Sequence, residues 1–241
     1  MKTLIKKIGL LALGGILSCG RGRQCPLCNW TGFQFLPRLN KRVPASDANC
    51  PRCGSAERHR FAYEALRSRL PLSFSILHFA PERQLEAWLR GRATHYTSCD
   101  ILPGRAMEVQ DITNLSYAEK TFDITWCSHV LEHVEDDHAA LNELYRVTKV
   151  GGMCVIQVPI WRRKSFEDPG ICSSKDRLEH FGRGDHVRLY GFDIEERIEE
   201  VGFRVETIIT RDFDPREVAR YGLNNLTTSE LFLCYRDGKS E

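Results

Sequence analysis

The chain of 241 residues lacks internal repeats and low-complexity segments, which argues against a repeat architecture or a compositionally biased, unstructured chain. Its N-terminal segment also lacks the roughly 20 apolar residues needed to span a bilayer, because the apolar run over residues 8–17 is only ten residues long. With 42% apolar and 27% charged residues, the composition is ordinary for a globular protein. The length fits one full-sized α/β domain with a small appendage.

Acidic residues are scarce at the start of the chain. Residues 1–70 contain three Asp and Glu against thirteen Lys and Arg, so this part carries +10 and the remaining 171 residues carry −8. Such a basic front end predicts either a polyanionic partner (RNA or an anionic membrane surface) or simply a solvated basic face.

Residues 1–20 form an apolar and basic segment of their own. A charged start, an apolar run and the nearby Cys19 are typical of a bacterial lipoprotein signal. The apolar residues also recur at helical spacing, which predicts an amphipathic helix lying on a membrane surface. Both interpretations remain open for this segment.

Four of the ten cysteines form two Cys-Pro-X-Cys pairs with 21 residues between them: Cys25, Cys28, Cys50 and Cys53. A tetrahedral zinc ion requires four such thiolates, and each two-residue gap lets one tight turn present two of them. Asn29 and Gly54, which follow the pairs, tolerate the positive φ that the turns need. We therefore predict a zinc ribbon over residues 21–54, with two disulfides as the alternative. The other six are expected to be small core residues: Cys19, Cys99, Cys127, Cys154, Cys172 and Cys234.

A helix with Ser55 as its cap is expected next, within a linker over residues 55–72. From residue 73 to the end, strand and helix patterns alternate, which predicts a doubly wound parallel sheet covered by helices. Strands are expected over 75–80, 95–100, 107–112, 122–128, 153–160, 204–210 and 229–236. Helices are expected over 82–91, over 136–149 and within 190–203, where the helix should start near Asp193.

Ligands of such sheets bind beyond the carboxyl ends of the strands. The first strand ends in the turn Ala80-Pro81-Glu82, which contains no glycine, and the next two end at Asp100 and Asp111. A carboxylate at the end of the second strand can accept both hydroxyls of a ribose.

The stretch "FDITWCSHVLEHVED", followed by "ALNELYRVTKVGG", resembles the class I S-adenosylmethionine-dependent methyltransferases, in particular the type 11 branch. The resemblance covers about residues 73–236, and the whole layout resembles small bacterial methyltransferases with an N-terminal zinc ribbon. It implies a Rossmann-like sheet of seven strands whose last strand is antiparallel. It also implies a set of cofactor-binding residues: His78, Phe79, Ala80, Glu82, Asp100, Asp111, Ile112, Cys127, Ser128 and His129.

Within that implied set, Asp100 holds the ribose, Asp111 and Ile112 flank the adenine, and residues 127–129 form the floor beneath the methyl donor. The first turn departs from the family pattern of an acidic residue followed by Gly-X-Gly. His78 stands at the acidic position, and Ala80 and Glu82 replace the glycines.

The motif "HVLEH" from His129 to His133 also matches the inverted zinc-protease pattern H-x-x-E-H. We expect instead that Glu132 and His133 cap the following helix and line the cleft. Residues 161–188 form a polar insertion, interpreted as a lid or as a solvated loop. Its candidates for orienting an acceptor are Glu167, Asp168, Asp185, His186 and Arg188. The candidate catalytic residues overall are His129, His133, His186 and Arg188.

The sequence thus predicts a methyltransferase with S-adenosylmethionine and a structural zinc ion, acting on RNA, a sugar or another small molecule. The alternative is a non-catalytic zinc-ribbon protein with a degenerate methyltransferase fold. An intracellular cofactor and reduced thiols predict a cytoplasmic location, with residues 1–20 in contact with the inner membrane surface.

Overall fold

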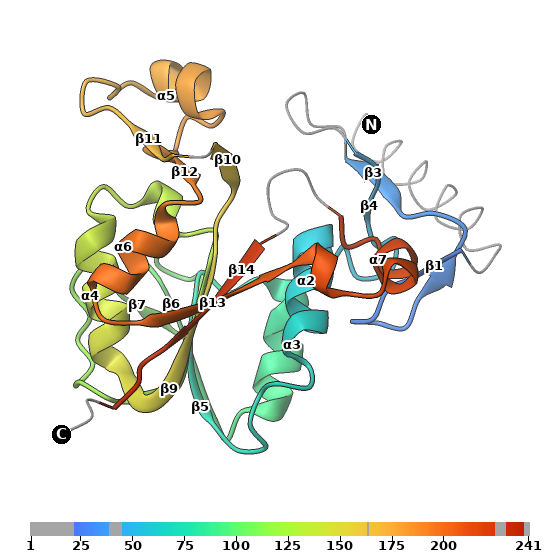
Figure 1. Cartoon of the computed structure of the whole chain (residues 1–241), viewed down its shortest axis with the longest axis horizontal. Coiled ribbons are helices and arrows are strands. Elements are labelled where there is room, and N and C mark those ends of the chain that lie inside the picture. The colour runs from blue at the N-terminus through green and yellow to red at the C-terminus, as the bar shows by residue number, and fades with distance from the viewer. Residues whose placement is uncertain (1–21, 39–44, 163, 225–229, 239–241) are drawn as a thin grey trace. The chain divides into compact units, whose positions relative to one another are not determined.

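The computed structural model describes residues 22–38, 45–162, 164–224 and 230–238 (Figure 1). The predictions for residues 1–20 therefore lie outside the described residues. The chain divides into two compact units. One contains the chain up to Leu70 together with Ile209–Ser229, and the other contains Pro71–Ile208 together with the chain from Glu230 onward. No helix of the described segments is both long enough and apolar enough to cross a membrane.

The second unit is built on a seven-stranded sheet in the order β13-β14-β9-β8-β5-β6-β7. The bounds are β5 Ser75–Phe79, β6 His95–Asp100, β7 Glu108–Val109, β8 Phe122–Ser128, β9 Thr148–Gln157, β13 Arg204–Ile209 and β14 Glu230–Tyr235. Strands β7, β6, β5, β8 and β9 run parallel, whereas β14 pairs with β9 in the antiparallel direction. The seven-stranded sheet with an antiparallel last strand is confirmed.

Strand β5 is the point at which the strand order reverses, because β6 pairs with one of its edges and β8 with the other. The chain moves from β5 to β6 in one direction along the sheet and from β8 to β9 in the other. Right-handed crossovers that run in opposite directions place their helices on opposite faces of the sheet. Accordingly, α3 (Arg83–Arg92) lies on one face, and α4 (Asp137–Val147) and α6 (Ile194–Glu200) lie on the other (Figure 1).

The helix expected to start near Asp193 does so, because Asp193 is the N-cap position of α6, which begins at Ile194. The short strand β12 at Arg188–Gly191 precedes it. Helix α4 begins where its pattern predicts, because the Asp136 carboxylate caps it by accepting a hydrogen bond from the Ala139 backbone N–H at 2.8 Å.

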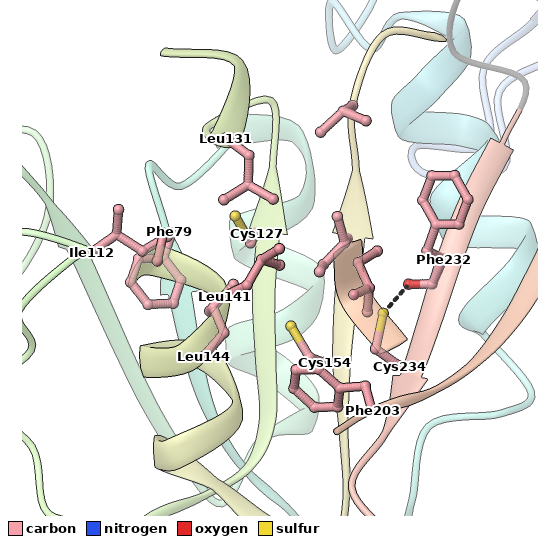
Figure 2. Close-up of a cluster of buried hydrophobic side chains, with 14 of the residues drawn as sticks. Phe79, Ile112, Cys127, Leu131, Leu141, Leu144, Cys154, Phe203, Phe232 and Cys234 are labelled. Atoms are coloured by element: carbon pink, nitrogen blue, oxygen red, sulfur yellow. Dashed lines mark hydrogen bonds between the residues drawn. The ribbon is translucent and has the colours of Figure 1, made fainter. Parts of the chain in front are cut away.

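The main core lies between the sheet and α4 and α6. Figure 2 shows the sulfurs of Cys127, Cys154 and Cys234, on three neighbouring strands, among apolar side chains. These three cysteines and Cys99 are buried, which confirms the expectation that they are small core residues. Cys172 is exposed, so for this residue the expectation was wrong. Cys19 lies outside the described residues.

The insertion over 161–188 is not an open loop. Strand β10 (Ile160–Arg162), β12 and β11 (Phe166–Glu167) form a small sheet in that order, and α5 spans Ser174–Phe181. Helix α5 begins at its Ser173 cap and ends at Gly182, whose φ of 87° is available to glycine without strain.

The first unit combines the cysteine pairs with helices from both ends of the chain. It contains β1 (Arg23–Gln24), β2 (Thr31–Gly32), β3 (Leu36–Arg38), β4 (Ala45–Asn49), α2 (Glu57–Leu66), a short 3-10 turn at Thr210–Asp212 and α7 (Pro215–Tyr221). The sequence placed residues 55–72 in a linker and 73–241 in one domain. The structure instead groups Ile209–Ser229 with the cysteine pairs.

One buried arginine explains this grouping. The Arg60 guanidinium donates to the carbonyl oxygens of Ser55 at 2.6 Å, Tyr221 at 2.6 Å and Gly222 at 2.9 Å. It also lies over the Phe35 ring, 3.9 Å from the ring centroid. Arg60 therefore links the cysteine turns, α2 and the end of α7 within one unit. None of these links is visible in local sequence patterns.

Candidate functional site

A cleft opens at the carboxyl ends of β5, β6 and β8, and it has a volume of about 660 Å³. This is the edge of the sheet at which doubly wound folds bind ligands, and the volume suits a ligand of nucleotide-cofactor size. Six of the residues implied by the family resemblance line it: Phe79, Ala80, Asp100, Asp111, Ile112 and His129.

Two of these residues have left-handed backbone conformations. Ala80, directly after β5, has φ of 43°, and His129, directly after β8, has φ of 55°. The Ala80 N–H donates to the Cys99 carbonyl at 2.8 Å, and the His129 N–H donates to the Gln157 carbonyl at 2.8 Å. Such conformations cost non-glycine residues about 1–3 kcal/mol and cluster at functional sites. Ala80 therefore adopts the backbone shape for which a glycine would be expected.

Asp100 ends β6 with one carboxylate oxygen uncommitted. Its Oδ1 accepts a hydrogen bond from the Leu102 N–H at 2.8 Å, and Oδ2 accepts none from the described residues. The next two side chains, Ile101 and Leu102, are 64% and 46% exposed although they are apolar, and both line the cleft. A hydrogen-bond acceptor beside exposed apolar surface is suited to a sugar joined to a flat ring.

The loop that carries Asp111 and Ile112 is fastened to α4. The Glu143 carboxylate accepts from the Leu115 N–H at 2.7 Å, and Arg146 donates to the carbonyls of Leu115 at 3.0 Å and Tyr117 at 2.7 Å. The Arg146 guanidinium, bound to Glu143, lowers the pKa of that carboxyl. This pair fixes the course of the loop just beyond the cleft.

Two further residues of the implied set, His78 and Glu82, are not among the residues that line the cleft. His78 is fully buried. Its Nε2 lies 3.0 Å from the Glu82 carboxylate, and its Nδ1 lies 3.0 Å from the Tyr96 hydroxyl. The two residues at the departure from the family pattern are thus bound to each other beneath the turn.

Cys127 and Ser128 are also absent from the cleft lining. Cys127 lies in the core, where burial raises the pKa of its thiol well above the ordinary value. Ser128 is buried, and its hydroxyl donates to the Gln157 side-chain oxygen at 3.5 Å. Of the expected floor at 127–129, only His129 reaches the cleft.

The opposite end of the cleft is formed by the chain after β8 and by the insertion. Its lining there includes His129, Val130, His133, Val134, Glu135, Asp136, Arg183 and Asp185. Arg183 donates two hydrogen bonds of 2.9 Å to Asp185, which lower the pKa of that carboxyl to about 2. Sequence reasoning missed Arg183, because no periodic pattern marks a side chain within an irregular turn.

Arg188 does not face the cleft and is fully engaged elsewhere. It is buried, and it donates to the carbonyls of Leu131, Val134 and Glu135 and to the Glu167 carboxylate. A guanidinium committed in this way cannot orient an acceptor. Its structural role is to fix the turn that presents His133.

Residues 129–133 do not form the zinc-protease arrangement. That arrangement requires both histidines on one face of a helix, whereas His129 lies in a left-handed turn and the 3-10 turn η1 spans only Leu131–His133. Asp136, rather than Glu132 or His133, caps α4.

Glu132 is instead buried beneath His129, with Oε1 lying 3.0 Å from the His129 Nδ1. Burial alone would raise the pKa of this carboxyl. The hydrogen bond from His129 and the nearby charges of His129 and His133 outweigh burial and lower it.

The four paired cysteines of the first unit converge. Their sulfurs all lie within 4.8 Å of one another, and the Cys25–Cys53 and Cys28–Cys50 sulfurs are each 3.6 Å apart. Sulfurs around a tetrahedral zinc ion are about 3.8 Å apart, whereas a disulfide joins them at about 2 Å. All four are free thiols. Asn29 and Gly54 have φ of 57° and 73°, which confirms the predicted turns.

The sequence predicted that Ser55 caps α2, but the structure places it at this cysteine cluster instead. Its hydroxyl lies 3.2 Å from the sulfurs of both Cys25 and Cys53. The N-cap position of α2 is Ala56.

Residues 72–156 match a protein family described as "Methyltransferase domain". The matched residues lie within the second unit and include the stretch on which the resemblance rests.

Curated relatives match over short segments. Demethylmenaquinone methyltransferase of Streptomyces avermitilis is 40% identical over 62 residues, which cover 24% of this chain and 27% of the relative. An uncharacterized methyltransferase of a Mycobacterium species is 39% identical over 49 residues, covering 20% of this chain and 19% of the relative. The chain thus spans about a quarter of the length of the curated relatives it matches.

Solved structures share the fold at low identity. A putative methyltransferase in complex with the Trm112 activator of Haloferax volcanii has a TM-score of 0.55 at 16% identity, covering 77% of this chain and 92% of that one. A Burkholderia thailandensis N1-methyltransferase with bound S-adenosylhomocysteine has a TM-score of 0.53 at 14% identity, covering 75% of this chain and 79% of that one. The [4+2]-cyclase SpnF has a TM-score of 0.55 at 16% identity, covering 96% of this chain and 93% of that one. Since one neighbour is a cyclase, the fold alone does not determine the reaction.

Proposed function

We propose that the protein is an S-adenosylmethionine-dependent methyltransferase that binds its cofactor in the cleft beyond β5, β6 and β8. The observation that carries the proposal is the position of Asp100. It ends the strand next to the point of reversed strand order, lines the cleft and has one oxygen free of hydrogen bonds from the described residues.

The cleft residues fit the two parts of such a cofactor unequally. The Asp100 carboxylate can accept the ribose hydroxyls, and Ile101, Leu102 and Ile112 offer apolar surface to the adenine. At the methionine end, the backbone at Ala80 has the left-handed turn, but the nearby carboxylate of Glu82 is bound to His78. We infer that the adenosine half contributes most of the binding free energy.

The bound cofactor supplies an electrophilic methyl group, and the protein supplies position and proton transfer. With its proton on Nδ1 and hydrogen-bonded to Glu132, the His129 imidazole has a lone pair on Nε2. A carboxylate that orients an imidazole in this way prepares it as a general base. This Nε2 atom is buried and has no hydrogen-bond partner among the described residues. We assign His129 to take the proton of the acceptor, which belongs to the class of RNA, sugar or other small molecule.

Titration of the full chain with S-adenosylhomocysteine in a calorimeter tests the proposal. We expect one site per chain with micromolar or tighter affinity. The absence of any binding heat at several temperatures, confirmed by the lack of a shift in the melting temperature, would favour the alternative of a degenerate, non-catalytic fold. The cytoplasmic location stays a prediction that such experiments leave open.

We propose separately that Cys25, Cys28, Cys50 and Cys53 hold one structural zinc ion. Four cysteine sulfurs within 4.8 Å of one another, in a unit with a small apolar core, support it. Metal analysis of purified protein should find this zinc, and it should be lost together with the fold of the first unit in a Cys28→Ser, Cys53→Ser variant. Zinc content equal to wild type in that variant would refute the assignment.

A further inference from the structure

Three potential metal ligands meet behind the acceptor end of the cleft. Glu132 and His133 come from the 3-10 turn η1, and His186 comes from the end of the insertion, just before β12. One ligand atom of each lies within 4.8 Å of those of the other two. The imidazole rings of His133 and His186 are perpendicular, with centroids 4.7 Å apart.

Two buried atoms of this group have no hydrogen-bond partner among the described residues: Glu132 Oε2 and His186 Nδ1. Glu132 is only 1% exposed and His186 only 6% exposed. Leaving a buried polar atom unsatisfied costs about 1–3 kcal/mol, and more for a charged group. A carboxylate oxygen and an imidazole nitrogen left unsatisfied together therefore indicate a missing occupant with positive charge.

The surrounding contacts leave the ligand atoms available. The Nδ1 of His133 lies 2.9 Å from the Asp185 carbonyl oxygen, to which it donates, so the lone pair is on Nε2. The Nδ1 of His129 is hydrogen-bonded to Glu132 Oε1, so the other carboxylate oxygen, Oε2, is available to bind an ion. Metal ligands are usually oriented by hydrogen bonds of this kind, in which the atom that does not bind the metal pairs with a carbonyl oxygen or with a second side chain.

We propose that Glu132, His133 and His186 bind a divalent transition-metal ion at the acceptor end of the cleft. Two imidazoles and one carboxylate suit Zn²⁺, Mn²⁺, Fe²⁺ or Co²⁺ better than Mg²⁺ or Ca²⁺, which prefer oxygen ligands. Bound ligand atoms are about 3.4 Å apart, so small rotamer changes close the site around the ion.

The site differs from the zinc-protease pattern in its ligands. His129 is not a ligand but orients Glu132, and His186 takes the place of the second imidazole. With three protein ligands, coordination positions remain open, and because His133 lines the cleft these positions can reach an acceptor.

This arrangement points to an acceptor that reacts through a hydroxyl group, an assignment of role that rests on the proposed function. An acceptor oxygen bound to the ion loses its proton more readily, and the proton passes to the His129 imidazole. The oxygen then forms a bond to the methyl carbon of the cofactor. The bond between that carbon and sulfur breaks, its electron pair stays on sulfur, and the product is a methyl ether.

Manganese titration of the full chain tests the ion's binding without any turnover. The protein is treated with EDTA, its remaining zinc is measured, and Mn²⁺ is added while the free ion is followed by electron paramagnetic resonance. We expect one Mn²⁺ per chain, because thiolate ribbons disfavour this ion. Glu132→Gln and His186→Gln should each weaken binding at least tenfold. A second zinc that survives EDTA and is missing from both variants would support the site equally.

The matched control is His138→Gln, an exposed histidine on α4 that is not in the group, which should bind Mn²⁺ like wild type. Both test variants must keep the ribbon zinc and the far-UV circular dichroism spectrum of wild type, which shows that they fold. The absence of saturable Mn²⁺ binding and of a second zinc, or binding that neither variant weakens, would overturn the site. Metal binding without S-adenosylhomocysteine binding would overturn the proposed function and leave the site standing.

Discussion

His78 and Glu82 are joined by a buried hydrogen bond of 3.0 Å beneath the turn that follows β5. His78 takes the position at which the related methyltransferases have an acidic residue, and Glu82 takes that of a glycine. The two replacements thus bind each other, and the left-handed residue Ala80 of this turn is held in place by β6.

If this contact is structural, Glu82→Gln should destabilise the protein but scarcely change cofactor binding. The amide keeps a hydrogen bond to His78 and loses only its charge, so we expect a loss of about 1 kcal/mol in the free energy of unfolding. Chemical denaturation and S-adenosylhomocysteine titration check the two effects. A tenfold loss of affinity at unchanged stability would show that Glu82 contacts the cofactor.

Enlarging Ala80 should block the cleft. Its side chain lies in the cleft lining at the left-handed turn, so Ala80→Leu projects a branched group into the space of the ligand. We expect S-adenosylhomocysteine binding to disappear, with Ala80→Gly as the matched variant that binds at least as well as wild type. Wild-type affinity in Ala80→Leu would mean that this turn is not part of the cofactor site.

Glu143→Gln tests the clamp that holds the loop of Asp111 and Ile112. Because the folded pKa of Glu143 is lower than its unfolded value, its charge contributes stability above the unfolded pKa, and that contribution is lost as the pH falls through the folded pKa. The variant should therefore be about 1 kcal/mol less stable at pH 7, and the difference should shrink once the pH falls below the unfolded pKa of Glu and vanish below the folded pKa. Urea unfolding across this range measures the difference. A constant or growing difference toward acid would contradict the assignment.

Arg60→Met should destabilise the first unit strongly. Three carbonyl oxygens lose their donor, and breaking a buried interaction of a charged group costs about 3–5 kcal/mol. We expect zinc to pass to a colorimetric chelator much faster than in wild type. Arg216→Met, at an exposed position of the same unit, serves as the control. Equal release from Arg60→Met and wild type would show that Arg60 does not hold the unit together.

The sequence predicts those parts of the molecule that depend on local pattern. Periodicity predicts the strands and helices of the sheet, and the two cysteine pairs with Asn29 and Gly54 predict the two turns that bring the four cysteines together. Each of these features is determined by residues close together in the chain.

The features that sequence reasoning missed depend on residues far apart in the chain. Arg60 joins the two ends of the first unit, and His186 approaches Glu132 only after the insertion has folded. The contact between His78 and Glu82 was not foreseen either, because the family pattern has different residues at both positions.

The affinity of Asp100→Asn for S-adenosylhomocysteine tests the central claim most directly. Wild type should bind at one site, and the variant should bind at least tenfold more weakly, because charge-assisted hydrogen bonds to the ribose hydroxyls contribute about 1.5–3 kcal/mol each. Asp237→Asn, an exposed aspartate outside the cleft lining, is the control and should bind like wild type. Equal affinities of Asp100→Asn and wild type, in a calorimetric titration of folded protein, would contradict a cofactor site at the end of β6.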